Sequence, residues 1–249
     1  MGLVTIKMIS ERDRIKKKIF EINPKRWKAD NFDVRYFLIF KLKNIEKQKI
    51  LDTGGGVGII LSELDKNNYR VNLDLSFNDL KNCIQNVDPE INPVCASITH
   101  LPFKQEIFDI VISSHVIELA KLIDVNQKTK GGNDSKNVNL LIHENHRVLK
   151  NGGKMFLTTP NFEYKQSPNK LSFLELKYVL SKFFKDFKIY FYNTLPKINN
   201  NRKLDFSNVV PKVWAKFSNP DIIIHSLLKE NSKNNYSVYF YAYARKKIS

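Results

Sequence analysis

The residues best placed to do chemistry begin with a glycine-rich segment, Asp-Thr-Gly-Gly-Gly-Val-Gly, at residues 52–58. Glycines at this spacing let the backbone turn sharply and approach a ligand closely. A dinucleotide fingerprint would need a third glycine where Ile59 stands, and a P-loop would need Gly-Lys-Ser or Gly-Lys-Thr. The carboxylate of Asp52 would repel a pyrophosphate, so the segment favours a cationic ligand.

Two further residues stand where such a ligand would be held. Asp74 ends the predicted strand 69–74, and a carboxylate there can accept hydrogen bonds from the two hydroxyls of a ribose. The alternative for Asp74 is a helix-capping or solvated role. His115 follows the apolar segment 108–113 and is the candidate general base. The alternative for His115 is packing beside the ligand or a hydrogen bond to the backbone.

The elements that must position these residues alternate along the chain. Strand patterns occur at residues 49–52, 69–74, 93–96, 108–113 and 154–159, and helical patterns at 59–66, 76–85 and 139–149. This alternation predicts a doubly wound α/β fold, in which functional side chains lie at the carboxyl ends of parallel strands. A helix at 172–184 and strands at 188–192 and 236–245 follow.

The charge of the chain is uneven. The 249 residues carry 41 Lys+Arg and 25 Asp+Glu, a net charge of +16. Residues 1–49 hold 14 basic and 6 acidic residues, residues 50–160 hold 11 and 13, and residues 161–249 hold 16 and 6. The basic flanks suggest an anionic partner, although the excess of Lys over Arg is also compatible with an A/T-rich genome.

Four stretches in order carry a family resemblance: residues 50–58, 71–76, 101–103 with 108–118, and 147–161. With these motifs the chain resembles class I S-adenosylmethionine (SAM)-dependent methyltransferases of the methyltransferase type 11 kind. The resemblance implies a Rossmann-like seven-stranded sheet whose last strand is antiparallel. It also implies a methyltransferase domain at 49–249, which follows a segment at 1–48 whose pattern predicts a helical extension. The insert at 195–235 is expected to cover the acceptor or, alternatively, to serve as a structural cap on the sheet.

The resemblance also implies roles for individual residues. Asp52 and the three glycines would lie along the methionyl part of SAM, Asp74 would hold the ribose and Leu75 would contact the adenine. Ser97 stands where the family usually has an Asp for the adenine amine, so adenine recognition would lean on the backbone near Ile98. Ser114, at the end of the fourth strand, would also lie beside the cofactor. The glycines in question are Gly54, Gly55 and Gly56.

The acceptor is the open part of the prediction. The segment Ser113-Ser114-His115-Val116 differs from the Asp/Asn-Pro-Pro-Tyr/Phe motif of base-amino methyltransferases. The resemblance therefore favours a small-molecule, lipid or quinone-like acceptor, in keeping with an anionic compound. The alternatives are an RNA or tRNA methyltransferase that uses the basic flanks, and a SAM- or RNA-binding module without catalysis. We expect a cytoplasmic enzyme without a metal or a membrane span, for which peripheral membrane contact stays open.

Overall fold

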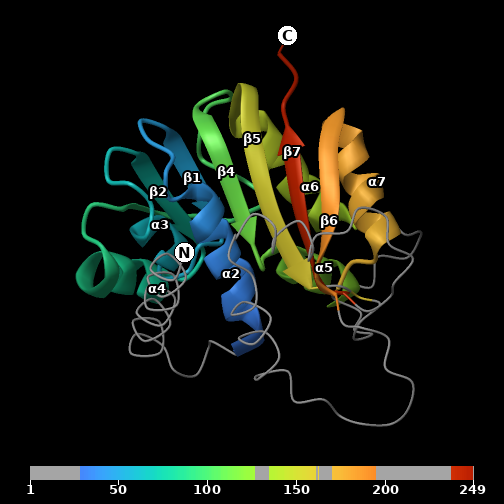
Figure 1. Ribbon diagram of the computed structural model, residues 1–249, viewed down its shortest axis with the longest axis horizontal. Coiled ribbons are helices and arrows are strands. Elements are labelled where there is room, and N and C mark those ends of the chain that lie inside the picture. Colours follow the sequence, from blue (N-terminus) through green and yellow to red (C-terminus); the bar gives the residue numbers. More distant parts are fainter. Residues whose placement is uncertain (1–28, 127–134, 161, 163–169, 195–236, 249) are drawn as a thin grey trace, which may run out of the picture.

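The computed structural model describes residues 29–126, 135–160, 162, 170–194 and 237–248. Seven strands form one sheet in the order β3-β2-β1-β4-β5-β7-β6 (Figure 1). Their bounds are β1 Lys49–Thr53, β2 Tyr69–Asp74, β3 Asn92–Cys95, β4 Phe108–Ser114, β5 Leu149–Pro160, β6 Asp186–Thr194 and β7 Ser237–Arg245. The helices are α2 Ala29–Leu42, α3 Ile59–Ser62, α4 Phe77–Asn82, the π-helical turn η1 Cys83–Val87, α5 Ile117–Asn126, α6 Lys136–Val148 and α7 Phe173–Phe183.

Strand direction defines the edge of the sheet that can hold a site. Strands β1 to β5 pair in parallel, so their carboxyl ends meet at one edge. Strand β7 is antiparallel to both β5 and β6, in a register that pairs Thr194 with Ser237. The end of β6 and the start of β7 therefore lie at the same edge as the carboxyl ends of the parallel strands.

The two faces of the sheet are covered by different helices. Alternate residues of β1 point to opposite faces, because side chains of a strand alternate. Ile50 packs in a core cluster with α2 and α3, whereas Leu51 packs in a second cluster with α5, α6 and α7. Figure 1 shows α2 in front of the sheet and α5, α6 and α7 behind it. This arrangement is the doubly wound fold that the sequence predicts.

Strand β2, the start of α4 and the terminal pair of strands confirm the prediction, and β2 has the predicted bounds. Strand β2 spans the predicted 69–74, and the Ser76 hydroxyl caps α4 by accepting the Asp79 N–H (3.3 Å). The predicted terminal pair of antiparallel strands is also confirmed as β6 and β7. Strand β2 is readable because Val71 and Leu73 alternate with polar residues at the period of a strand.

Several helices differ from the prediction; α6, for example, begins at Lys136 and not at residue 139. The helix predicted over 59–66 ends at Ser62, because side chains take over the hydrogen bonds that would continue it. Arg70 donates to Leu61 O (3.1 Å), and Asp65 Oδ1 accepts the Asn67 N–H (2.7 Å). Helix α5 at 117–126 was not among the predicted elements. The predicted segments at 1–28 and 195–235 lie outside the described residues, and the division at residue 48 stays a prediction.

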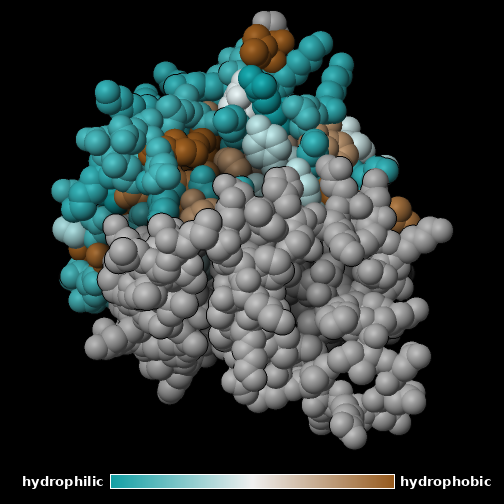
Figure 2. Space-filling view, viewed as in Figure 1, coloured by the Kyte–Doolittle hydropathy of each residue, from teal (hydrophilic) through white to brown (hydrophobic). Residues whose placement is uncertain are grey.

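On the face drawn in Figure 2, the described surface is mainly polar. Figure 2 shows hydrophilic side chains over the top of the molecule, the side on which the C-terminus lies. No helix in the described part of the chain combines the length and the apolar composition needed to cross a bilayer.

Candidate active site

The glycine-rich segment forms a tight turn between β1 and α3. Gly54 and Gly56 have φ angles of 77° and 57°, a left-handed conformation that strains any residue with a Cβ. A Cβ on Gly54 would also collide with the side chain of Val116, whereas the space beside Gly56 is open. The Gly54 N–H donates to Leu73 O (2.7 Å), which joins the turn to the end of β2. The sequence therefore needs glycine here for backbone conformation and for clearance.

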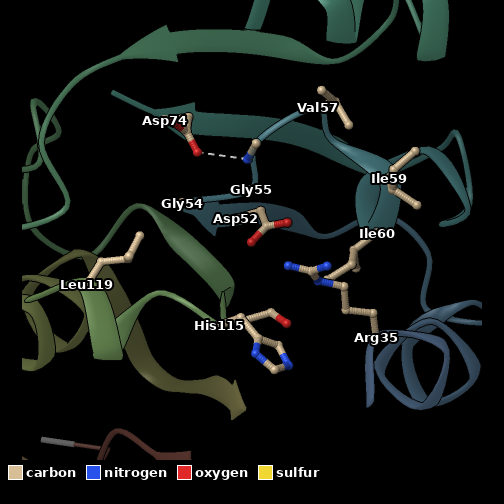
Figure 3. Close-up of a pocket in the computed structure, with 12 residues that line it drawn as sticks. Arg35, Asp52, Gly54, Gly55, Val57, Ile59, Ile60, Asp74, His115 and Leu119 are labelled. Carbon is tan, nitrogen blue, oxygen red and sulfur yellow. Dashed lines mark hydrogen bonds between the residues drawn. The ribbon is translucent and has the colours of Figure 1, made fainter. Parts of the chain in front are cut away.

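Asp74 is fixed at the end of β2 by two backbone donors. Its Oδ2 accepts the Gly56 N–H (2.8 Å), drawn as the dashed line in Figure 3, and its Oδ1 accepts the Ser76 N–H (2.9 Å). Each carboxylate oxygen has a further lone pair, so each can still accept a hydrogen bond from a hydroxyl group. The Asp74 carboxylate is thus held in place and can still accept hydrogen bonds from the two hydroxyls of a diol.

Asp52 lies below the turn, with 1% of its surface exposed. Its two carboxylate oxygens are buried and have no hydrogen-bond partner among the described residues. Burial raises the pKa of Asp52 to about 7, while Arg35 opposes and Asp74 reinforces the shift. A buried carboxylate of this kind costs free energy until a cation or donor reaches it. The site is therefore prepared for a positively charged group.

These residues line one cavity of about 280 Å³ at the carboxyl edge of the sheet. Figure 3 shows Asp52 of β1 and the Arg35 guanidinium of α2 facing each other; His115 follows β4 beside them, with its carbonyl oxygen nearer to them than its ring. The lining residues are Arg35, Asp52, Gly54, Gly55, Gly56, Val57, Ile59, Ile60, Asp74, Ser114, His115 and Leu119. The cavity thus brings together Asp52, Asp74, Ser114, His115 and the three glycines that the sequence singled out.

His115 has an unusual backbone and a carboxylate neighbour. Its φ of 56° is left-handed, a rare conformation for a non-glycine residue that tends to occur at functional sites. Its N–H donates to Thr158 O (2.9 Å), and its Nδ1 lies 3.4 Å from Glu118 Oε1. Glu118 Oε2 in turn accepts from the Thr159 hydroxyl (3.3 Å). Burial lowers the pKa of His115, and Glu118 opposes that shift.

Arg35 and Glu118 are functional candidates that no motif of the sequence identifies. Arg35 is the charged residue in the otherwise apolar and aromatic run from Val34 to Phe40, which is a usable signal. Glu118 stands three residues after His115, the spacing that brings two side chains together at the start of a helix. Neither signal says which side chain reaches the cavity, because that depends on how α2 packs against the sheet.

The three residues expected near the adenine lie outside the cavity-lining set. Leu75 is 73% exposed, and Ile98 packs against the core cluster behind the sheet. The Ser97 hydroxyl lies 2.9 Å from the Thr99 hydroxyl and accepts the Thr99 N–H (3.3 Å). The Ala96 N–H donates to Asp74 O (3.2 Å), so these residues follow adjacent strand ends. Their contact with adenine stays a prediction.

The chain matches known methyltransferases by sequence and by fold. Residues 51–157 match a family model described as a methyltransferase domain. An uncharacterized protein of Methanocaldococcus jannaschii is 29% identical over 130 residues, which cover 52% of this chain and 48% of that protein. The match thus spans about half the length of that relative.

Two solved structures share the fold. A SAM-dependent methyltransferase of Thermotoga maritima has a TM-score of 0.55 and 16% identity, covering 92% of this chain and 97% of that one. Phosphoethanolamine N-methyltransferase 2 of Haemonchus contortus, solved in complex with SAM, has a TM-score of 0.54 and 18% identity, covering 86% and 52%. At these identities the similarity establishes the fold.

Family match, fold and cavity agree on the class of protein. Residues 51–157 match a methyltransferase domain, and the sheet has the fold of class I SAM-dependent methyltransferases, enzymes whose cofactor is SAM. The residues present fit that cofactor: the buried carboxylate of Asp52 suits the ammonium of its amino-acid end, and Asp74 suits its ribose.

Proposed function

We propose that the chain transfers the methyl group of SAM to a small-molecule or lipid acceptor whose attacking atom loses a proton to His115. The observation that carries the proposal is that His115 lines the same cavity as Asp52, Asp74 and the glycine turn. A base in that position is useful for an acceptor hydroxyl or protonated amine, and unnecessary for a nucleophile that carries no proton.

The reaction asks little covalent chemistry of the protein. SAM supplies an activated methyl group, because its sulfonium becomes a neutral thioether, S-adenosylhomocysteine (SAH), when the methyl–sulfur bond breaks. The side chains position the reactants in line, and such positioning alone can account for a large part of a rate enhancement. As the acceptor forms its bond to the methyl carbon, its proton passes to the imidazole of His115.

Glu118 supports this role of His115 as a positioning residue. Because Glu118 faces Nδ1 at 3.4 Å, it favours the tautomer with a proton on Nδ1 and leaves Nε2 to take up the acceptor's proton. Burial lowers the pKa of His115 below its ordinary 6.5, so at neutral pH the ring is uncharged and can accept a proton.

A labelled product screen tests the proposed reaction. The purified chain is incubated with a metabolite and lipid extract and an equal mixture of SAM and SAM with a trideuterated methyl group. We expect products that appear as mass doublets separated by three deuterium-for-hydrogen replacements, and that are lost with His115→Asn while SAH binding is kept. Doublets that persist at full intensity in His115→Asn would contradict the role of the base.

The role of Glu118 has a readout that needs no acceptor. In Glu118→Gln the carboxylate that raises the pKa of His115 is gone, so we expect that pKa to fall further. Titration of the His115 ring followed by NMR measures the shift, with His115→Gln used to assign the signal. An unchanged pKa would show that Glu118 does not act on the ring.

The basic flanks keep RNA as the rival acceptor. Residues 161–249 carry 16 basic and 6 acidic residues, a balance that also suits a phosphate backbone. Filter binding of a transfer RNA pool at increasing salt separates the two acceptors. Binding whose logarithm falls steeply with the logarithm of salt concentration, together with methylated RNA, would favour the rival. Methylation of a small molecule at a rate insensitive to salt would favour the proposal.

A further inference from the structure

Arg35 places a positive charge in the cofactor cavity from an element outside the matched family region. It belongs to α2, whereas the family match begins at residue 51. Among the described residues that line the cavity, Arg35 is the one lysine or arginine. Its guanidinium points toward Asp52 in Figure 3 and lies on the side of Asp52 away from Asp74.

The helix holds Arg35 in a fixed position. The four residues that follow it, Tyr36 to Ile39, are all buried and contribute to the core cluster on the front face of the sheet. The Phe37 ring packs edge-on against Tyr241 of β7, with 4.9 Å between the ring centroids. Because α2 is anchored on the sheet, the Arg35 side chain extends into the cavity from a fixed backbone position, which lowers the entropic cost of binding a ligand.

The amino-acid end of SAM carries two opposite charges on one carbon. Asp52 suits the ammonium, but its own negative charge repels the neighbouring carboxylate of the ligand. A guanidinium beside Asp52 removes that conflict, since it can bind a carboxylate through two parallel hydrogen bonds. In Figure 3, Asp74 lies on one side of Asp52 and Arg35 on the other, so a ligand whose ribose meets Asp74 would bring both charges of its amino-acid end to Asp52 and Arg35.

We propose that Arg35 binds the carboxylate of the methionyl part of SAM, so that Arg35 and Asp52 together recognise both charges of its amino-acid end. This inference rests on SAM being the ligand of the cavity. It extends the cofactor site to α2 and gives that helix a functional as well as a structural role.

Calorimetric titration with two ligands tests the assignment without any turnover. SAH carries the amino-acid end, and 5′-methylthioadenosine shares its adenosine and thioether but lacks both charges. In Arg35→Gln we expect SAH to bind about 10- to 100-fold more weakly, in keeping with the loss of a charged hydrogen-bonded pair. We expect 5′-methylthioadenosine to bind as it does to the wild type.

Two further variants make the test specific. Lys41→Gln removes a positive charge from the last turn of the same helix, at an exposed residue outside the cavity, and should change neither affinity. Arg35→Lys keeps the charge without the planar pair of donors, and should weaken SAH less than Arg35→Gln does. The thermal midpoint of each variant reports on its folding.

The contrary outcomes are distinct. If Arg35→Gln weakens both ligands equally, Arg35 acts through the structure of the site and the proposal is overturned. If neither affinity changes, Arg35 does not touch the ligand and the proposal is also overturned. If the wild type binds no SAH at all, the assignment of SAM to this cavity fails, and the proposal for Arg35 fails with it.

Discussion

At the scale of single residues, Asp52 shows how a binding site is kept ready at a cost in stability. Its pKa is raised from 3.8 to about 7, chiefly by burial, so the folded chain holds a proton that the unfolded chain has lost over that range. Folding stability contributed by this group is therefore present below about pH 4 and decreases as the pH rises toward about 7. The ionised form becomes favourable again when a cation is bound beside it.

This linkage predicts how cofactor affinity depends on pH. Because the ammonium of SAH pairs with ionised Asp52, we expect the affinity to fall by up to about tenfold per pH unit below about pH 7. Calorimetric titrations from about pH 5.5 to about pH 8 measure the slope. In Asp52→Asn the slope should vanish and the affinity above about pH 7 should drop, while the thermal midpoint of the ligand-free protein rises. A slope that persists in the variant would assign the proton to another group.

At the scale of elements, the strands were predictable and the helix ends were not. Buried strands such as β4, with the apolar run Ile110 to Ile112, can be found from local sequence, and their parallel order follows from the alternation with helices. Helix α6 begins where it does because Asp124 of α5 accepts the N–H groups of Asn137 (3.0 Å) and Val138 (3.4 Å). The premature end of α3 at Ser62 likewise depends on Arg70, eight residues beyond it. Such contacts join elements that the sequence alone does not bring together.

The same limit applies to the candidate site. The residues of the glycine turn, with Asp52, Asp74 and His115, were predictable because their positions at strand ends suffice to place them at one edge. The position of Arg35 depends on the docking of α2, which follows from the burial of Phe37 and its neighbours rather than from any motif. The sequence pattern therefore predicts the site residues that lie at strand ends, but not the residue that α2 contributes.

Arg70 makes a testable prediction at this scale, because it joins three elements. It is 1% exposed, pairs with buried Asp88 (2.8 Å) and donates to Leu61 O at the end of α3. Replacing Arg70 with Leu leaves the Asp88 charge buried, so we expect the free energy of unfolding to fall by about 3–5 kcal/mol. Urea denaturation measures the change.

The neighbouring surface pair supplies a control for the Arg70 variant. Lys66 and Glu90 lie 3.2 Å apart with side chains 71% and 56% exposed. Lys66→Gln should therefore change the free energy of unfolding by less than about 1 kcal/mol. Adding Asp88→Asn to Arg70→Leu should recover part of the lost stability. If Arg70→Leu costs no more than Lys66→Gln, the buried pair does not hold these elements together.

At the scale of the whole molecule, the distribution of charge separates two tasks. The central residues 50–160, which build most of the cavity, hold 11 basic and 13 acidic residues, whereas the flanks hold the entire positive excess. A near-neutral centre with buried Asp52 suits a cationic cofactor, and positive flanks would attract an anionic acceptor or surface. Long-range attraction of this kind acts mainly on association and is screened by salt.

Removing positive charge from a flank should therefore weaken use of the acceptor without changing the affinity for SAH. We expect replacement of Lys16, Lys17 and Lys18 by Gln to raise the Michaelis constant for an anionic acceptor several-fold at low salt, and to leave the affinity for SAH unchanged. The difference between variant and wild type should disappear at high salt, because the screening length then shortens to a few ångströms. An equal loss of acceptor use and SAH affinity would mean that these lysines support the fold. No loss of either would leave genome composition as the source of the positive charge in this part of the chain.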